Sequence, residues 1–289
     1  MNTFINKIFN CKNDATFEKL ALEIFDFQME NNPIYSAYAR IILKGEDPTN
    51  IYEIPFLPVE FFKTEQIICQ GQAIEEIFLS SGTKGEQSKH LVSNIELYKS
   101  SYQKAFQLFY GNITDYCILA LLPSYKEREG SSLIYMFDDL IKKSKHQQSN
   151  YYLNNYDELA TTLKELENKK QKTILFGVTY ALLDLAEEFP QKLEHTIIME
   201  TGGMKGQRKE LLKEEIHSIL KHSFATAHIH SEYGMTELLS QGYSQGNNIF
   251  KTPPWMKILT RDVNDPLSII SNKTGGINVI DLANIFSCP

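Results

Sequence analysis

The sequence predicts an α/β fold with a mainly parallel sheet, helices on both faces of that sheet, and a smaller β-rich lobe. Apolar runs alternate with amphipathic stretches through the middle of the chain, which is typical of strand–helix units in a parallel sheet. These runs are continuously apolar, as expected of strands covered on both faces. Short strands and Pro or Gly turns replace this pattern after Phe250. We therefore expect an α/β core over residues 1–250 and the β-rich lobe over residues 251–289.

The elements follow in order along the chain. Helical spacing of apolar residues predicts helices over residues 17–28 and 34–43, and the segment 54–62 is too proline-rich for a regular element and too apolar for a free linker. We expect these residues to be buried without forming a regular helix or strand. Ser93 and Glu96 have the spacing of a capping box for the next helix. Further strands are expected at 76–79, 116–122, 173–178 and 195–199, and further helices at 131–143, 157–169, 180–188 and 209–220.

Composition and charge restrict the classes of function. The 289 residues are 42% hydrophobic and 22% charged, as in soluble globular proteins. There is no apolar run that could span a bilayer and no apolar core of a secretory signal, so we expect a cytoplasmic protein. The net charge of −7 disfavours a nucleic-acid partner but allows a small anionic ligand, which needs only local donors and a cation. The four cysteines have no paired metal spacing and are expected to be reduced.

The first functional signal is a hydroxyl- and glycine-rich loop that directly follows the strand at 76–79. Its hydroxyls and lysines could bind an anion, and its glycines let backbone N–H groups face one. The residues are Ser80, Ser81, Gly82, Thr83, Lys84 and Gly85, with Lys89 shortly after. The loop lacks the Walker pattern. An ordinary surface turn rich in small residues is the alternative.

The second signal is the segment Tyr233-Gly234-Met235-Thr236-Glu237. We expect the end of a strand that opens into a turn with an exposed acid. Tyr233 could stack on a purine, Thr236 could hydrogen-bond a phosphate oxygen, and Glu237 could hold Mg²⁺ through a hard oxygen ligand. The alternative is an ordinary helix start, with Thr236 as its cap and Glu237 near the positive end of the helix.

Two nearby features are weaker. The loop 201–206, with Gly202 and Gly203, permits close backbone approach to a flat ligand, although a simple tight turn explains it equally well. His228, His230 and Glu232 alternate, so on a strand they would share one face, as in a site of two histidines and one carboxylate. Alternating polar residues on an edge strand are the simpler interpretation. His217 and His222 are expected on the preceding helix or its exit.

The combination of the two main segments resembles the adenylate-forming superfamily of acyl-CoA synthetases, firefly-type luciferases and peptide-synthetase adenylation domains. Three further stretches, 54–63, 200–206 and 280–284, are similar to the acyl-protein synthetases of the LuxE type, the long-chain-fatty-acid–protein ligases. Phenylacetate–CoA ligases look like more distant relatives. The similarity runs from about Pro33 to the end of the chain.

The resemblance implies the large N-terminal domain of the adenylate-forming fold. It also implies that ATP activates a carboxylic acid, expected to be a fatty acid, and that the acyl group is then transferred to a thiol. An acyl-acceptor or reductase protein is the implied partner, and the oligomeric state stays open. ATP and Mg²⁺ are the implied cofactors. The resemblance implies that the triphosphate is bound by Ser80, Ser81, Gly82, Thr83 and Gly85, and that Lys84 takes part in catalysis. It also implies that the adenine is bound by Gly202, Gly203, Tyr233 and Gly234, that Thr236 contacts the α-phosphate, and that Glu237 binds Mg²⁺.

The sequence departs from the family pattern in several places. Lys84 stands where many relatives have a threonine, and Ser88 stands where a lysine often follows. The expected ribose-binding aspartate, the carboxy-terminal lid domain with its catalytic lysine, and the acceptor thiol would fall beyond Pro289. We therefore expect the lid domain to be absent. A CoA ligase, a non-catalytic nucleotide- or acyl-binding module and a metal-dependent hydrolase at His228, His230 and Glu232 stay open as alternatives.

Overall fold

The structure is a computed structural model that describes residues 2–81, 87–122, 130–153, 155–202 and 211–289. The chain divides into two compact units. Unit 1 consists of residues 1–105, 235–241 and 252–289, and unit 2 consists of residues 106–234 and 242–251. The expected boundary after residue 250 differs from this division, because residues 252–289 group with the first 105 residues.

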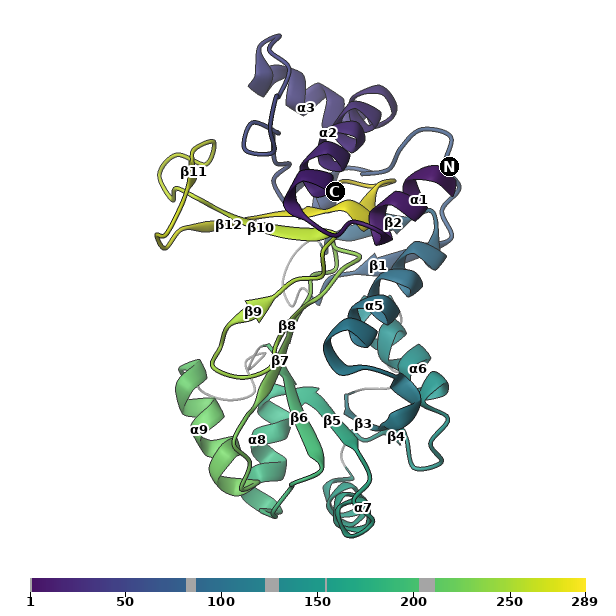
Figure 1. Cartoon of the computed structure of the whole chain (residues 1–289), viewed down its shortest axis with the longest axis vertical. Helices are drawn as coiled ribbons and strands as arrows, with labels where there is room; N and C mark the ends of the chain where they lie inside the picture. The colour runs from purple at the N-terminus through teal and green to yellow at the C-terminus, as the bar shows by residue number, and fades with distance from the viewer. Residues whose placement is uncertain (1, 82–86, 123–129, 154, 203–210) are drawn as a thin grey trace. The chain divides into compact units, whose positions relative to one another are not determined.

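Unit 2 is built on a seven-stranded sheet with the strand order β4-β3-β5-β6-β7-β8-β9 (Figure 1). The pairs from β4 to β7 are parallel, and β8 and β9 are added antiparallel. The expected mainly parallel sheet is therefore confirmed. The strands are β3 (Cys117–Leu121), β4 (Asn150–Tyr151), β5 (Thr173–Val178), β6 (Thr196–Thr201), β7 (His230–Tyr233), β8 (Gly242–Ser244) and β9 (Phe250–Lys251).

Helices cover both faces of this sheet. The helical elements of unit 2 are η1 (Ile113–Asp115), α6 (Ser132–Ser144), α7 (Tyr156–Asn168), α8 (Thr179–Glu188) and α9 (Lys213–Ser223). On one face, the ring of Phe137 in α6 stacks on Phe176 in β5 with their centroids 3.8 Å apart. On the other face, α8 approaches β5 so closely that a Cβ on Gly177 would lie 2.9 Å from the Leu182 side chain. Glycine at 177 therefore allows this close approach.

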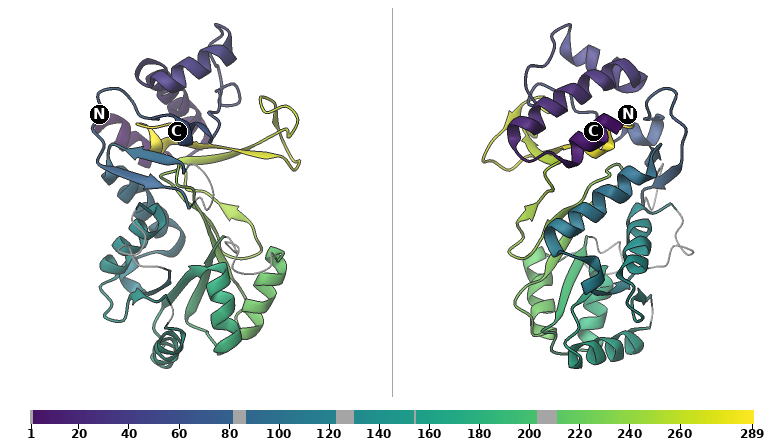
Figure 2. Two further views of the ribbon diagram at one scale, coloured as in Figure 1. Left: turned by 180° about the vertical axis from the view of Figure 1, so that it is seen from behind. Right: turned by 45° about the vertical axis from the view of Figure 1, so that its right-hand side comes forward.

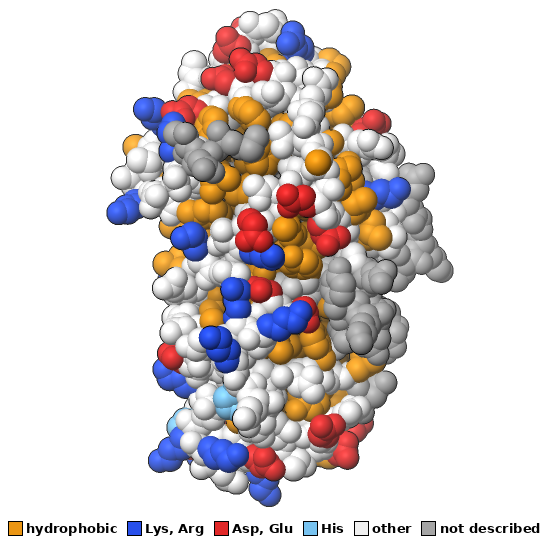
Figure 3. Space-filling model, turned by 90° about the vertical axis from the view of Figure 1, so that its right-hand side faces the viewer, with side chains coloured by type: hydrophobic (Ala, Val, Ile, Leu, Met, Phe, Trp, Pro, Cys, Tyr) orange, Lys and Arg blue, Asp and Glu red, His pale blue; other side chains and the backbone are white. Residues whose placement is uncertain are grey.

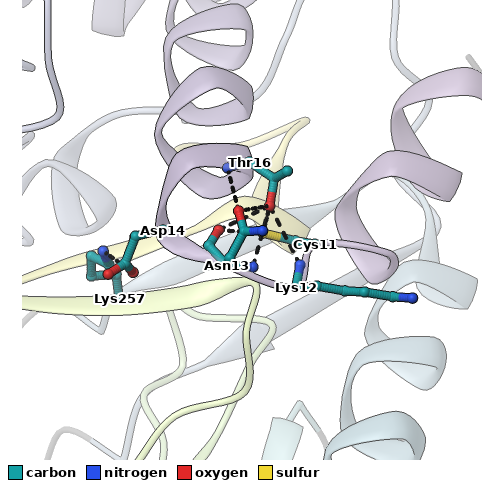
Figure 4. A network of polar contacts seen from close by, with 6 residues as sticks. All are labelled: Cys11, Lys12, Asn13, Asp14, Thr16 and Lys257. Atoms are coloured by element: carbon teal, nitrogen blue, oxygen red, sulfur yellow. Dashed lines mark hydrogen bonds and ion pairs between the residues drawn. The ribbon is translucent and has the colours of Figure 1, made fainter.

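The α-helices described in unit 1 lie in the N-terminal part of the chain. They are α1 (Asn2–Phe9), α2 (Asp14–Asn31), α3 (Pro33–Leu43), α4 (Phe61–Thr64) and the start of α5 (Ile95–Tyr110), which continues into unit 2. The side-chain oxygen of Asn13 accepts from the Thr16 N–H at 2.9 Å, and Thr16 Oγ1 accepts from the Asn13 N–H at 3.3 Å (Figure 4). This capping box fixes the start of α2. Asp14 then forms an ion pair with Lys257 at 2.8 Å.

The strands of unit 1 form two small antiparallel sheets (Figure 2). One is the hairpin of β1 (Glu76–Leu79) and β2 (Lys89–Val92). The other has the order β11-β10-β12, from β10 (Met256–Arg261), β11 (Ile269–Ile270) and β12 (Gly276–Asp281), and ends in the turn η3 (Leu282–Asn284). This second sheet is the expected β-rich lobe. Helix α1 contacts η3, so both ends of the described chain lie in unit 1.

Two local expectations need correction. The predicted capping box of Ser93 and Glu96 is wrong: Asn94 Oδ1 accepts from the N–H groups of Glu96 and Leu97 at 3.1 and 3.3 Å. Because α5 begins one residue later than expected, Asn94 occupies the capping position. The segment 54–62 is irregular as expected, but only Pro55 and Phe62 in it are buried, Pro58 and Glu60 are exposed, and its end forms the short helix α4.

The surface carries charges of both signs. On the face shown in Figure 3, acidic and basic side chains are interspersed among hydrophobic ones. Within the described ranges, no helix combines the length and the apolar character needed to cross a bilayer.

Candidate functional site

The hydroxyl-rich loop is held in unit 1 by the β1–β2 hairpin. The Ser80 N–H donates to the Ser88 carbonyl at 3.1 Å, and the Ser88 N–H donates to Ser80 Oγ at 3.0 Å. The Gln87 side chain donates to the Ser80 carbonyl at 2.8 Å, and Ser81 is exposed. The predicted residues Gly82, Thr83, Lys84 and Gly85 lie outside the described residues. The loop is thus closed by a second strand, β2, which the sequence reasoning missed.

Thr236 and Glu237 lie in a turn of unit 1, shortly after β7. The Leu238 N–H donates to the Met235 carbonyl at 3.2 Å, and this turn does not continue as a helix. The alternative of an ordinary helix start is therefore wrong. The expected exposure of Glu237 is also wrong, because its side chain is only 8% exposed. Among the described residues, none donates a hydrogen bond to the Glu237 carboxylate or forms an ion pair with it.

A buried histidine links the hairpin to this turn. His90, on β2, is fully buried, and its Nδ1 lies 2.8 Å from the Thr236 carbonyl oxygen. Its Nε2 lies 2.9 Å from Asn284 Oδ1, and Asn284 Nδ2 donates to the Glu237 carbonyl at 2.9 Å. Burial lowers the pKa of His90 to about 4, against the opposing effect of these two contacts, so the ring is neutral at pH 7. The sequence analysis did not identify His90 or Asn284. The one signal that could have indicated His90 is a polar residue at an inward-facing position of a short strand.

A second buried network anchors the other end of the same turn. The Leu239 N–H donates to Asp281 Oδ2 at 2.8 Å, and Ser240 Oγ donates to Asp281 Oδ1 at 2.6 Å. The indole N–H of Trp255 donates to the hydroxyls of Ser101 and Ser240 at 3.0 and 3.1 Å. Burial raises the pKa of Asp281 to about 6, although the hydrogen bonds that it accepts oppose this. The turn after β7 is therefore held from both sides within unit 1.

The remaining predicted residues belong to unit 2. Tyr233 is the last residue of β7, Gly234 follows it, and the chain passes into unit 1 directly after Gly234. The Tyr233 ring meets Phe250 edge-on with centroids 6.2 Å apart. Gly202 follows β6 and is exposed, and a Cβ there would meet no atom within 4 Å among the described residues. Gly203 lies outside the described residues.

Glu200 is a buried carboxylate near the end of β6. Lys213 Nζ lies 2.9 Å from Glu200 Oε1, His217 Nε2 lies 3.6 Å from the same atom, and Thr179 Oγ1 donates to Oε2 at 3.1 Å. Burial by itself would raise the pKa of Glu200, but its contacts with His217, Ser231 and Lys213 outweigh this and lower it to about 2. The charge on Glu200 is thus already compensated by Lys213 and His217 of α9. This favours a structural role for Glu200 over a role in binding a substrate or a metal ion.

Glu232 lies on the opposite face of the sheet. Thr201 Oγ1 donates to Glu232 Oε2 at 2.8 Å, and burial, with a smaller effect of the Glu200 charge, raises the pKa of Glu232 to about 7. His230 Nδ1 contacts the Tyr110 hydroxyl at 3.3 Å. In the described part of the chain, no three His, Cys, Asp or Glu side chains are grouped so that they could hold a metal ion. The expected position of His217 on a helix is confirmed, because it lies on α9.

Cys288 is a poor nucleophile. Burial, followed by the effect of Cys69, raises the pKa of its thiol to about 12. Since the thiolate is the reactive form, this thiol is almost entirely unreactive at neutral pH. None of the four cysteines, which all lie in the described ranges, forms a disulfide bond.

Comparison with solved structures identifies the fold. ATP-bound MatB from Rhodopseudomonas palustris matches with a TM-score of 0.56 at 15% identity, over 74% of this chain and 40% of that chain. A 2-hydroxyisobutyryl-CoA ligase in the postadenylation state, in complex with 2-HIB-AMP, matches with a TM-score of 0.59 at 10% identity, over 93% of this chain and 60% of that chain. An open conformation of the same ligase, in complex with 2-HIB-AMP and CoA, matches with a TM-score of 0.55.

The chain therefore shares the α/β fold of part of these solved structures. The chain spans 40% of the length of the first of these structures and 60% of the second. No protein-family model matches the sequence, and no curated protein matches it.

Proposed function

We propose that this chain is part of an enzyme that uses ATP to activate a carboxylic acid as its acyl-adenylate and then transfers the acyl group to a thiol. In this proposal, residues 80–85 hold the triphosphate, Thr236 contacts the α-phosphate and Glu237 ligates Mg²⁺. Gly202, Gly203, Tyr233 and Gly234 would contribute to the adenine site. The proposal combines the two sequence motifs with the fold shared with ATP- and adenylate-bound ligases.

The observation that carries the proposal is the environment of Glu237. Its side chain is buried, and within the described residues no donor or cation is paired with its carboxylate. The carboxylate oxygens are nevertheless not among the buried atoms that lack a partner, so they reach the surface, where a hard divalent cation could bind them as oxygen ligands. The side chains of Ser80, Ser81 and Thr236 fit the same ligand, since hydroxyls can donate to phosphate oxygens.

The reaction needs no enzyme nucleophile in its first step. The substrate carboxylate attacks the α-phosphorus of ATP, a new C–O–P bond forms, and pyrophosphate leaves with the electron pair of the broken P–O bond. The protein contributes positioning and charge stabilisation, for which the hydroxyls of Ser80, Ser81 and Thr236 are suited. Mg²⁺ supplies neutralisation of phosphate charge when it is bound. A thiol then attacks the mixed anhydride, and AMP leaves.

Two acceptors are proposed for the second step. Similarity of residues 54–63, 200–206 and 280–284 to the LuxE-type ligases supports a protein thiol as acceptor and a fatty acid as substrate. The ligase described in complex with CoA supports free coenzyme A as the alternative. The high pKa of Cys288 argues against an acceptor within this part of the chain.

Exchange of labelled pyrophosphate into ATP tests the first step. The protein is incubated with ATP, Mg²⁺, labelled pyrophosphate and one of a series of straight-chain acids of increasing length. We expect label in ATP that depends on the acid and disappears when the acid is omitted. Tight ATP binding without exchange for any acid would instead indicate a non-catalytic nucleotide-binding module.

The acceptor is tested separately. With a radiolabelled acid that supports exchange, label in coenzyme A would identify a CoA ligase, and label that stays on a protein through denaturation and is released by hydroxylamine would identify a protein thioester. The second result is expected from the LuxE-type motifs.

A further inference from the structure

Two consecutive carbonyl groups in the turn after β7 are each held by a side chain from a distant segment of unit 1. The Thr236 carbonyl lies 2.8 Å from Nδ1 of His90. The Glu237 carbonyl accepts from Nδ2 of Asn284 at 2.9 Å. His90 precedes Thr236 by 146 positions, and Asn284 follows Glu237 by 47. The turn is thus fixed by contacts that its own sequence does not supply.

The two side chains also lie beside one another. Asn284 Nδ2 donates to the Cys288 carbonyl at 2.9 Å as well as to that of Glu237. Both partners of this nitrogen are acceptors, so the amide orientation is determined and Oδ1, also an acceptor, lies 2.9 Å from His90 Nε2. A neutral imidazole has one N–H, so a ring that donates from Nδ1 to the Thr236 carbonyl makes no hydrogen bond from Nε2 to Asn284. The imidazole is enclosed further by the ring of Phe62, whose centroid lies 5.9 Å away at near right angles. His90 and Asn284 thus each hold one of the two consecutive carbonyl groups, and we call this pair the bracket.

This bracket constrains the direction in which the Glu237 side chain leaves the backbone. The Thr236 carbonyl belongs to the peptide plane before the Glu237 Cα, and the Glu237 carbonyl belongs to the plane after it. Because each peptide unit is planar, fixing both planes fixes φ and ψ of Glu237 and hence the direction of its Cα–Cβ bond. Two residues before His90 in the chain, Ser88 closes the loop that starts at Ser80. Strand β2 and the residue just before it thus contact both functional segments of unit 1.

We propose that His90 and Asn284 are positioning residues that aim the Glu237 carboxylate at the metal ion of the bound nucleotide. This inference rests on the proposed function, in which Glu237 ligates Mg²⁺. Neither residue touches the substrate. The competing explanation is that they only satisfy buried carbonyl groups, as most buried backbone groups require. The two explanations differ in what they predict for Mg²⁺-dependent binding of ATP.

The test uses isosteric variants of the full chain. In His90→Asn the side-chain nitrogen lies near the former Nδ1 and keeps a donor for the Thr236 carbonyl. In His90→Gln the side-chain amide lies near the former Nε2, and the Thr236 contact is lost. Asn284→Asp keeps an oxygen for His90 but loses the donor to Glu237. The dissociation constant of ATP is measured by calorimetry with Mg²⁺ and again with EDTA, together with the melting temperature.

We expect His90→Gln and Asn284→Asp to weaken Mg²⁺–ATP binding about tenfold or more, as is usual when the partner that orients a metal ligand is removed. His90→Asn should retain affinity within about threefold. With EDTA, all variants should bind ATP as the wild type does, since Glu237 would act only through the metal. If both His90 variants fail to fold, Asn284→Asp decides alone.

Tyr35→Phe is the control for stability. It removes a buried hydrogen bond from the Tyr35 hydroxyl to the Pro55 carbonyl, 2.8 Å long, away from the turn. It should lower the melting temperature and leave the affinity unchanged. If the His90 and Asn284 variants behave in the same way, the positioning role is overturned. If the wild type itself binds no Mg²⁺–ATP, the proposed function is overturned instead, and the two failures are therefore distinguishable.

Discussion

At the scale of single residues, the buried carboxylates of unit 2 divide into two kinds. Glu200 has Lys213 and His217 beside it, and its pKa of about 2 keeps it ionised. Among the described residues, Glu232 accepts a hydrogen bond only from the Thr201 hydroxyl, and burial raises its pKa to about 7. The two side chains come from neighbouring parallel strands but point to opposite faces of the sheet. Local charge compensation, and not depth alone, decides which of them carries a charge.

Glu232→Gln should make the protein more stable at alkaline pH. The folded-state pKa of Glu232 is raised to about 7 from an ordinary value of 4.5, so between these values the unfolded chain has already released the proton that the folded chain keeps. Stability from this group is therefore present below pH 4.5 and is lost as pH rises towards 7. The variant lacks this loss and keeps an acceptor for Thr201. Melting temperatures at pH 5 and pH 8 measure the difference, which corresponds to roughly 3 kcal/mol at most.

The control for this experiment is Glu200→Gln. Glu200 is ionised at both pH values, so this variant should lose stability by a similar amount at pH 5 and pH 8. A gain for Glu232→Gln that does not grow between pH 5 and pH 8 would show that Glu232 is already ionised when folded.

At the scale of elements, the start of α2 depends on its cap. The Asn13 side chain satisfies the Thr16 N–H, which no carbonyl of the helix can reach. Asn13→Ala should destabilise unit 1 by about 1 kcal/mol, and Asn13→Asp should be nearly neutral because aspartate caps equally well. Chemical denaturation of both variants measures this. Equal stability of the alanine and aspartate variants would mean that the cap contributes nothing.

The contact between β5 and α8 depends on Gly177. A Cβ at this position would come within 2.9 Å of Leu182 and 3.1 Å of Leu121, both in the core. Gly177→Ala should therefore force the helix outward and cost about 1–3 kcal/mol, as overpacking does. Gly45→Ala is the contrasting variant, since a Cβ there meets nothing within 4 Å and only its positive φ is unfavourable. A fully stable Gly177→Ala protein would show that α8 is loosely packed.

At the scale of the whole chain, the structural features that could be predicted are those that depend on short-range patterns of residues in the sequence. The parallel strands were predictable because residues 173–178 form a continuous apolar run, and the strand found there has those bounds. Strand β2 was missed because Lys89 and His90 give it no apolar alternation, and because a loop, not a regular element, was expected there. The buried state of Glu237 was not predictable from its own segment. The Glu237 carbonyl, for its part, is held by Asn284, which lies in another element of unit 1.

Much of the candidate site was predicted from motifs, and its supporting residues were not. Ser80, Thr236 and Glu237 were identified from residue types whose chemistry suits phosphate and Mg²⁺. His90 and Asn284 act through partners 146 and 47 positions away, so no local pattern marks them. Their assignment required the packed structure of unit 1.

The most direct test of the account is calorimetric titration of the chain with Mg²⁺–ATP, repeated on Glu237→Gln and on Glu60→Gln, an exposed carboxylate of unit 1. The account predicts binding by the wild type and by Glu60→Gln, and a loss of affinity of about tenfold or more in Glu237→Gln that disappears when Mg²⁺ is removed. Equal binding of Mg²⁺–ATP by all three proteins, or by none of them, would contradict it.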